Sequence, residues 1–231
     1  MAMNFRRYAI YFTPPEKSPL ARFGATWLGW EIARGQPIAQ PYIQGLPARL
    51  ADITEAPRRY GFHATIKPPF RLAPGTTAED LNAALARLCD QMTPIALDGL
   101  HLAPMGRFLA LRPRGETAQL SGLAAAVVET LDSFRAPPEP AELEKRRAAR
   151  LTARQEALLT RWGYPWVMEE FRFHMTLTGK LDDAPREQVR AVLARRLDGL
   201  CPTPFPLDAL SLVGEAEDGR FHLIHRHTLS I

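Results

Sequence analysis

Two segments far apart in the chain share one alternation of apolar and polar residues, and this alternation predicts a β-strand in each. Successive side chains of a strand point to opposite faces, so a half-buried strand alternates apolar and polar residues. Residues 59–67 and 170–178 both follow this pattern. Each is expected to bury its apolar face and to present a histidine and, two residues later, a threonine. These are His63 and Thr65 in the first segment and His174 and Thr176 in the second.

The sequences that follow the two segments also correspond to each other. Each segment is followed by a helical pattern, then by an apolar stretch containing Leu-Asp-x-Leu, then by a strand-like stretch that begins with Gly-Arg-Phe. The shared order and spacing indicate an internal duplication. The three units lie at 78–91, 95–100 and 106–111 in the first copy and at 185–197, 206–210 and 219–224 in the second.

The remaining patterns divide the chain into two approximate lobes. Because proline clusters resist both helix and sheet, residues 136–140 are the best linker candidate. We therefore expect a single duplicated domain over 1–231, with lobes 1–135 and 136–231. Pro68 and Pro69 are expected to end the first histidine strand. The other predicted elements are a strand at 8–12, helices at 19–33, 117–134 and 141–162, and a loop-rich stretch at 37–57.

Composition is that of an ordinary globular protein, with 231 residues of which 46% are hydrophobic and 23% charged. No apolar run approaches the roughly 20 residues that cross a bilayer, and residues 1–7 lead into a strand pattern instead of a signal peptide. A cytoplasmic location is the default expectation. The two cysteines are too few for a disulfide scaffold or a zinc site, and both Cys89 and Cys201 are interpreted as packing residues.

Charge adds a modest indication of the ligand. A formal net charge of +4 suits a phosphorylated or polyanionic ligand. Much of the excess lies at 145–154 beside acidic residues, as on a solvated helix, and basic residues do not interleave with aromatic ones as in single-strand binders. The charge pattern therefore favours a small phosphorylated ligand over RNA.

The paired motif has the chemistry of a phosphodiester site. Histidine titrates near neutrality, so two imidazoles facing one cleft can divide the work of general base and general acid. The hydroxyls of Thr65 and Thr176 can donate to non-bridging phosphoryl oxygens. Lys67 falls on the same predicted face as His63 and would add a positive charge for the phosphate.

These residues resemble the two-histidine (2H) phosphoesterase superfamily, which is named for two His-φ-Ser/Thr-φ motifs in a duplicated chain, where φ is apolar. Residues 63–66 (His-Ala-Thr-Ile) and 174–177 (His-Met-Thr-Leu) both fit. The flanking stretches 60–70 and 162–165 look like a branch encoded in bacterial phosphonate-utilisation operons. The resemblance implies an α+β fold of two pseudo-twofold-related lobes, with antiparallel sheets, flanking helices and a central cleft.

The same resemblance implies an activity. Members open cyclic phosphates or cleave 2',5'-linked phosphodiesters without metal or cofactor, so His63 and His174 would be the acid-base pair and Thr65 and Thr176 the phosphate-binding pair. Operon context suggests a phosphoribosyl cyclic phosphate as substrate. Which histidine is the base stays open, as does the oligomeric state. Besides Lys67, the candidate substrate contacts are Tyr11, Arg59, Tyr60, Tyr164 and Arg172.

Two other interpretations compete with this one. The first is an RNA- or nucleotide-binding module that uses the same basic cleft without catalysis, and the second is a 2',5'-RNA ligase or phosphodiesterase. A metal site at the C-terminal histidines is disfavoured, because His225 and His227 share a strand face but His222 does not, and no cysteine or well-phased carboxylate completes a ligand shell.

Overall fold

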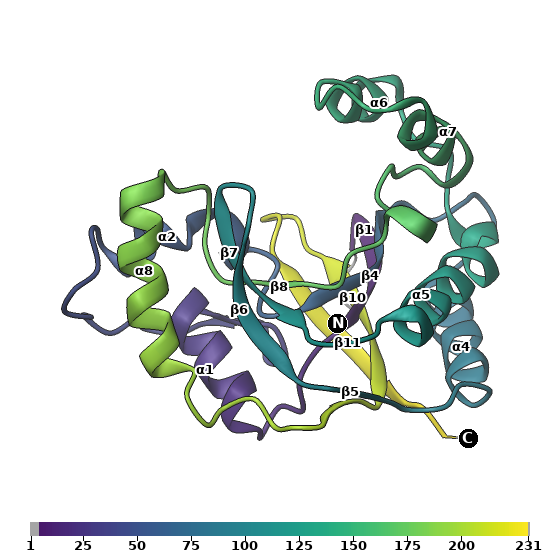
Figure 1. Cartoon of the computed structure of the whole chain (residues 1–231). Coiled ribbons are helices and arrows are strands. Elements are labelled where there is room, and N and C mark those ends of the chain that lie inside the picture. The colour runs from purple at the N-terminus through teal and green to yellow at the C-terminus, as the bar shows by residue number, and fades with distance from the viewer. Residues whose placement is uncertain (1–4, 231) are drawn as a thin grey trace.

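A seven-stranded antiparallel sheet organises the computed structural model, which describes residues 5–230 (Figure 1). Residues 1–4 of the N-terminal stretch discussed above lie outside the described range. The strand order is β11-β10-β1-β4-β8-β7-β6, and two short ribbons, β2-β3 and β5-β9, complete the strands. The strands are β1 Arg7–Phe12, β2 Trp30–Glu31, β3 Gln36–Pro37, β4 Ala64–Phe70, β5 Ile95–Leu97, β6 Leu100–Met105, β7 Phe108–Pro113, β8 Met175–Thr176, β9 Phe205–Leu207, β10 Ala209–Glu215 and β11 Phe221–Thr228.

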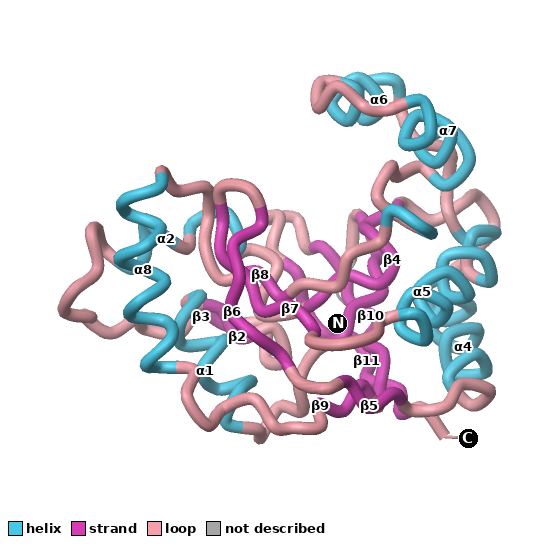
Figure 2. Tube along the Cα trace, viewed as in Figure 1, coloured by secondary structure: helices cyan, strands magenta, loops and turns pink. Residues whose placement is uncertain are grey.

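In the view of Figure 1, α1 and α8 lie at the left of the molecule and α4 and α5 at the right. Figure 2 shows the same arrangement by element type. Among the described residues, no helix is long and apolar enough to cross a bilayer. The helices are α1 Pro19–Leu28, α2 Leu50–Ile53, α3 Glu55–Arg58, α4 Ala78–Cys89, α5 Ala118–Thr130, α6 Pro140–Arg147, α7 Ala153–Trp162 and α8 Asp183–Arg196, with 3-10 turns at Asp132–Phe134 and Met168–Glu170.

Two predicted helices were too long, and local chemistry explains both errors. The helix expected over 19–33 ends at Leu28, because Gly29 adopts a left-handed conformation and caps it. The helix expected over 141–162 is two helices, α6 and α7. Thr152 starts α7 with a capping box, accepting from the backbone N–H of Gln155 while its own N–H donates to the Gln155 side chain.

The main core lies on one face of the sheet. Ile10 and Phe12 of β1 pack with Ala64 and Ile66 of β4, and this cluster also includes the inner sides of α4, α5 and α8. The opposite face of β1 belongs to a separate, smaller cluster containing Tyr11 and Phe221. We call this second face, which also carries Thr65 opposite Tyr11, the site face.

The duplication appears in space as two interleaved repeats. Ala64 pairs with Met175, its equivalent in the second motif, and β5 pairs with β9, its own equivalent. The hairpin of the first repeat, β6-β7, adjoins β8 of the second, while β10-β11 joins β4 through β1. The α+β fold with antiparallel sheets, predicted from the sequence resemblance, is confirmed. The lobe boundary near residue 135 stays a prediction.

Candidate active site on the sheet

The two histidine motifs lie on neighbouring strands at the centre of the sheet. In the antiparallel pairing of β4 with β8, Ala64 lies directly opposite Met175. Because the pairing is antiparallel, moving one residue outward on each side sets His63 opposite Thr176 and Thr65 opposite His174. Each histidine therefore faces the threonine of the other motif. The structure thus brings together all four side chains for which the sequence predicted catalysis.

Each imidazole is held by a backbone carbonyl two residues earlier in its own motif. The Nδ1 atom of His63 lies 3.0 Å from the carbonyl oxygen of Gly61, and that of His174 lies 2.7 Å from the carbonyl oxygen of Arg172. A carbonyl oxygen only accepts, so Nδ1 is the protonated nitrogen in both rings. Nε2 is then the basic atom of each neutral imidazole, and both Nε2 atoms are free of the backbone.

The spacing of the motifs suits a phosphoryl group. His63 and His174 occupy diagonal positions on adjacent strands. The Cα atoms of two such residues lie roughly 7–8 Å apart. All four motif side chains are partly buried, as expected for groups at the base of an open site. His63 and Thr176 line a hollow of about 230 Å³, together with Tyr60, Phe108 and Lys180. A phosphate placed there is within reach of both motifs.

His63 is the more strongly perturbed of the two bases. Its ring stacks on Tyr11, with centroids 3.7 Å apart and planes 23° from parallel. Burial, with a smaller contribution from the nearby His174, lowers the pKa of His63 to about 4, although the bond to the Gly61 carbonyl acts in the opposite direction. Its Nε2 atom lies 3.1 Å from Thr65 Oγ1, which donates to it when the ring is neutral. His63 therefore rests as a neutral imidazole near pH 7.

His174 has a cationic neighbour that sequence reasoning missed. β7 pairs with β8 through Leu111 and Met175, so Arg112 lies opposite His174. Burial lowers the pKa of His174, and the charge of Arg112 lowers it further, against the raising effect of the Arg172 carbonyl. The Nε atom of Arg112 is buried and has no hydrogen-bond partner among residues 5–230. The guanidinium is therefore available to an anion beside His174.

Lys67 does not share the site face, so that expectation was wrong. Tyr11 pairs with Thr65 but Ile10 pairs with Lys67, which leaves Ile66 as the extra residue of a β-bulge. The bulge turns Lys67 to the core face, where it is 2% exposed. Its Nζ atom donates to the Val128 carbonyl at 3.0 Å and to Asp132 at 3.3 Å. Burial lowers the pKa of Lys67 to about 8. The expectation that Pro68 and Pro69 end the first histidine strand was also wrong, because β4 continues to Phe70. The neighbouring strand β8 has only two residues, so no residue of β8 requires a backbone N–H from the two prolines.

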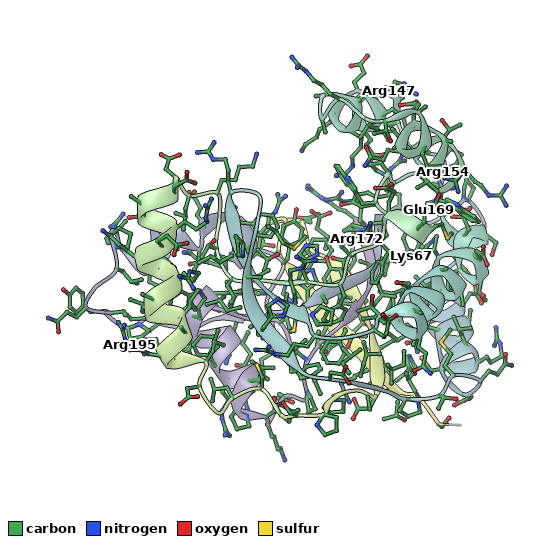
Figure 3. All side chains as sticks on the ribbon, viewed as in Figure 1. Lys67, Arg147, Arg154, Glu169, Arg172 and Arg195 are labelled. Carbon is green, nitrogen blue, oxygen red and sulfur yellow. The ribbon has the colours of Figure 1, made fainter. Side chains whose placement is uncertain are left out.

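The remaining candidate contacts surround the motifs at different depths. Tyr11 is 1% exposed, which makes it a support for the His63 ring instead of a surface contact. Tyr60 is partly buried beside His63, and the Arg59 guanidinium stacks on its ring and donates to its hydroxyl. Arg172 is exposed near the centre of the view in Figure 3 and donates to the carbonyls of residues 169 and 171. Tyr164 packs beneath Arg146, whose guanidinium is 4.6 Å from its ring centroid.

The described residues contain no group of three or more His, Cys, Asp or Glu side chains placed to hold a metal ion. His225 and His227 lie near each other, with ring centroids 4.2 Å apart, but His227 is engaged with Asn82. Cys89 is buried and Cys201 partly buried. The polar groups that the two motifs and β7 bring together are two imidazoles, two hydroxyls and one guanidinium.

Two curated relatives are similar to nearly the whole chain. A protein of Janthinobacterium sp. (strain Marseille), named ribose 1,5-bisphosphate phosphokinase PhnN, is 42% identical over 94% of this chain. A protein of the same name from Laribacter hongkongensis (strain HLHK9) is 38% identical over 92%. The matches cover 49% of each relative. The chain thus spans about half the length of the curated relatives it matches.

Solved structures and one family are also similar. E. coli LigT complexed with 3'-AMP is 14% identical, with 99% of this chain and 100% of that one covered and a TM-score of 0.45. A structure described as a phosphoesterase is 14% identical with a TM-score of 0.40, covering 98% of this chain and 99% of the other. The family described as "Protein of unknown function (DUF1045)" matches residues 65–222, which include Thr65, His174 and Thr176. The chain belongs to this family.

Proposed function

We propose that the chain is a metal-independent phosphoesterase that opens a small cyclic phosphodiester by general acid-base catalysis. The pairing of Ala64 with Met175 supports this proposal most strongly, because it brings both imidazoles to adjacent strands beside a phosphate-sized hollow that His63 and Thr176 line. Each group used in this way accelerates a proton transfer step by ~10²- to 10⁴-fold.

The proposed reaction uses the two histidines in different protonation states. Neutral His63 accepts a proton at Nε2 from a water molecule, whose oxygen attacks phosphorus in line with one ring oxygen. As the bond from phosphorus to that oxygen breaks, protonated His174 donates its Nε2 proton to the leaving oxygen. The product is a monoester with a free hydroxyl. Burial lowers the pKa of both rings in the free chain, and the bound anionic phosphate would raise them again, which prepares His174 as the acid.

The other polar groups stabilise the phosphate. The hydroxyls of Thr65 and Thr176 and the guanidinium of Arg112 come from neighbouring positions on β4, β8 and β7 and would donate to the non-bridging oxygens. Because these donors are fixed by the sheet, little reorganisation is needed as charge shifts in the transition state.

For the substrate, we propose a phosphoribosyl cyclic phosphate acted on in the cytoplasm. The name of the two relatives contains a phosphorylated ribose, which supports a ligand of that chemistry. Their kinase activity is not carried over, since the chain covers 49% of each and its sequence contains no Gly-x-x-x-x-Gly-Lys-Ser/Thr phosphate loop.

The test is hydrolysis of a panel of cyclic phosphodiesters in the presence of a chelator. The panel contains nucleoside 2',3'-cyclic phosphates and phosphoribosyl 1,2-cyclic phosphate, and the wild type is compared with His63→Ala and His174→Ala. We expect chelator-resistant turnover that falls by about 10²-fold or more in each variant. Absence of turnover on every member, together with wild-type RNA binding by both variants, would instead indicate a non-catalytic binding module.

A further inference from the structure

A basic groove adjoins the catalytic motifs, and none of the acid-base or phosphate-binding groups proposed above lines it. The groove has a volume of about 270 Å³ and lies between the sheet and the helical arm formed by α6 and α7. Six cationic side chains but only one carboxylate, that of Glu142, line it. The cations are Arg7, Arg59, Arg71, Arg135, Lys145 and Arg146.

The groove adjoins the candidate active site. Tyr60 lines both the groove and the hollow that contains His63. By strand alternation, Arg7 lies on the site face with Tyr11, which is paired with Thr65. Four residues of strand separate Arg7 from Tyr11, or about 13 Å along the sheet. Since an arginine side chain bridges part of that distance, we expect the remaining gap to be of the size of a single sugar.

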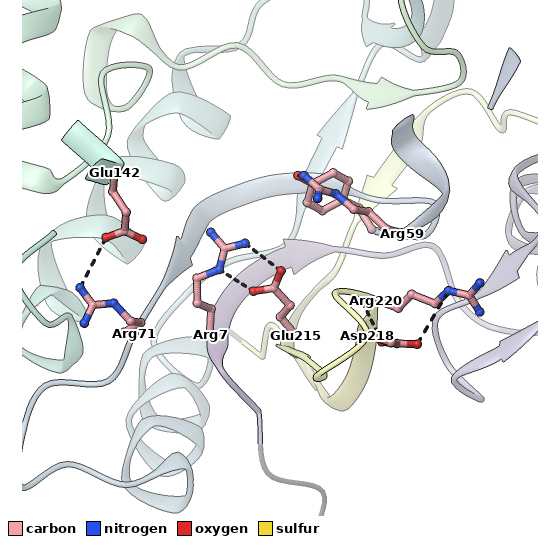
Figure 4. A network of polar contacts seen from close by, with 8 residues as sticks. Arg7, Arg59, Arg71, Glu142, Glu215, Asp218 and Arg220 are labelled. Carbon is pink, nitrogen blue, oxygen red and sulfur yellow. Dashed lines mark hydrogen bonds and ion pairs between the residues drawn. The ribbon is translucent and has the colours of Figure 1, made fainter. Parts of the chain in front are cut away.

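The groove carries more positive charge than its carboxylates neutralise. Arg7 forms a bidentate pair with Glu215 (Figure 4), and Arg71 is shared between Glu139 and Glu142. Arg135 is paired with Asp132. By contrast, three cations form no ion pair with any carboxylate in residues 5–230. They are Arg59, which stacks on Tyr60, Arg146, which stacks on Tyr164, and Lys145.

We propose that this groove binds a phosphate monoester at the far end of the substrate, so that the enzyme prefers a sugar cyclic phosphate carrying a second phosphate. Arginines approaching from β1, from the end of β4 and from α6 surround the space from several sides, which suits the oxygens of a phosphate dianion. The identity of the reacting phosphate rests on the proposed function. Binding of the second phosphate does not, and it can be measured alone.

The first experiment measures the groove without catalysis. Calorimetry on the full chain compares ribose 5-phosphate with ribose as probes. The double variant Lys145→Gln/Arg146→Gln removes two cations that pair with no carboxylate in residues 5–230, so we expect it to keep the fold, which circular dichroism checks. Arg195→Gln is the matched control, because Arg195 is exposed on α8, far from the arm (Figure 3).

We expect ribose 5-phosphate to bind at least about tenfold more tightly than ribose, and the double variant to lose about tenfold or more of that affinity. The control should bind as the wild type does. Equal binding of the two sugars, or unchanged binding of ribose 5-phosphate in the double variant, would overturn the assignment of the groove.

The second experiment tests the groove during turnover. Adenosine 2',3'-cyclic phosphate is compared with its 5'-phosphorylated form. The wild type should show a kcat/KM about tenfold or more higher for the phosphorylated form, mostly through KM, and the double variant should lose this preference. Turnover without any preference would refute the groove while leaving the phosphoesterase function intact. Tight binding of ribose 5-phosphate without turnover of these nucleotides or of any other cyclic phosphodiester in the panel would refute the phosphoesterase function alone.

Discussion

The phenol ring of Tyr11 lies face to face with the imidazole of His63 at a centroid distance of 3.7 Å. The two residues come from neighbouring strands, β1 and the start of β4, so the contact fixes the ring plane of His63 from the side opposite to its cross-strand threonine. Because Tyr11 is buried, we predict that it affects catalysis by positioning the imidazole and not by touching the substrate.

Tyr11→Phe should keep the stack and most of the activity, whereas Tyr11→Leu should lose it. Without the facing ring, His63 can rotate about its side-chain bonds, and we expect kcat to fall by about tenfold with little change in KM. Steady-state kinetics on both variants, with circular dichroism to establish folding, check this. Equal kcat values for the leucine and phenylalanine variants would show that the stack has no positioning role.

The dependence of kcat/KM on pH should be bell-shaped, with its maximum on the acidic side of neutrality. The base is lost as pH falls through the pKa of His63, which burial lowers to about 4. The acid is lost as pH rises through the pKa of His174, which burial lowers from 6.5. The maximum should therefore lie between about pH 4 and pH 6.5. Because the two histidines interact, the apparent pKa values of the two limbs belong to the pair and not to either residue alone. A maximum above pH 7 would contradict the lowered pKa values of the two rings.

Replacement of Arg112 should change both the rate and the pH profile. Arg112→Gln removes a phosphate-binding charge, so kcat/KM should fall by about 10- to 100-fold. It also removes a cation that lowers the pKa of His174, so the alkaline limb should move to higher pH. Arg107→Gln is a matched control on the exposed turn of the same hairpin. A lower rate with an unmoved alkaline limb would mean that Arg112 does not act on His174.

Replacement of Lys67 should affect stability and spare catalysis. Lys67→Met breaks the buried bonds to Val128 and Asp132, and the free energy of unfolding should fall by about 1–3 kcal/mol. Asp132 keeps its pair with Arg135, which limits the loss. Urea unfolding and kcat/KM, measured side by side, check this. A raised KM at unchanged stability would return Lys67 to the set of substrate contacts.

The motif residues could be predicted from sequence because strand alternation is a local property. It placed His63 with Thr65 and His174 with Thr176 on the polar side of their strands, and all four are partly buried in the structure. The duplication then indicated that the two strands are equivalent, although only the fold shows that they are neighbours.

Lys67 shows where local alternation fails. One extra residue at Ile66 reverses the phase of the strand, and the bulge depends on pairing with β1, some fifty residues earlier. Arg112 and the basic groove were missed for a related reason. Arg7, Arg71 and Arg146 come from three distant segments, and nothing in any one segment indicates that they converge. By contrast, the start of α7 could have been predicted from the sequence, because Thr152-x-x-Gln155 is a capping-box sequence.

The exchange of hairpins between the two repeats has a consequence for how the protein can be divided. The hairpin β6-β7 from the first half flanks β8 of the second, and β10-β11 from the second half closes the sheet beside β1 of the first. A chain cut at the proline-rich segment 136–140 would leave each fragment with an unpaired edge that only the other fragment satisfies. Co-expressed fragments should therefore reassemble by complementation, whereas either one alone should aggregate, as if the molecule were a covalently linked, strand-swapped dimer.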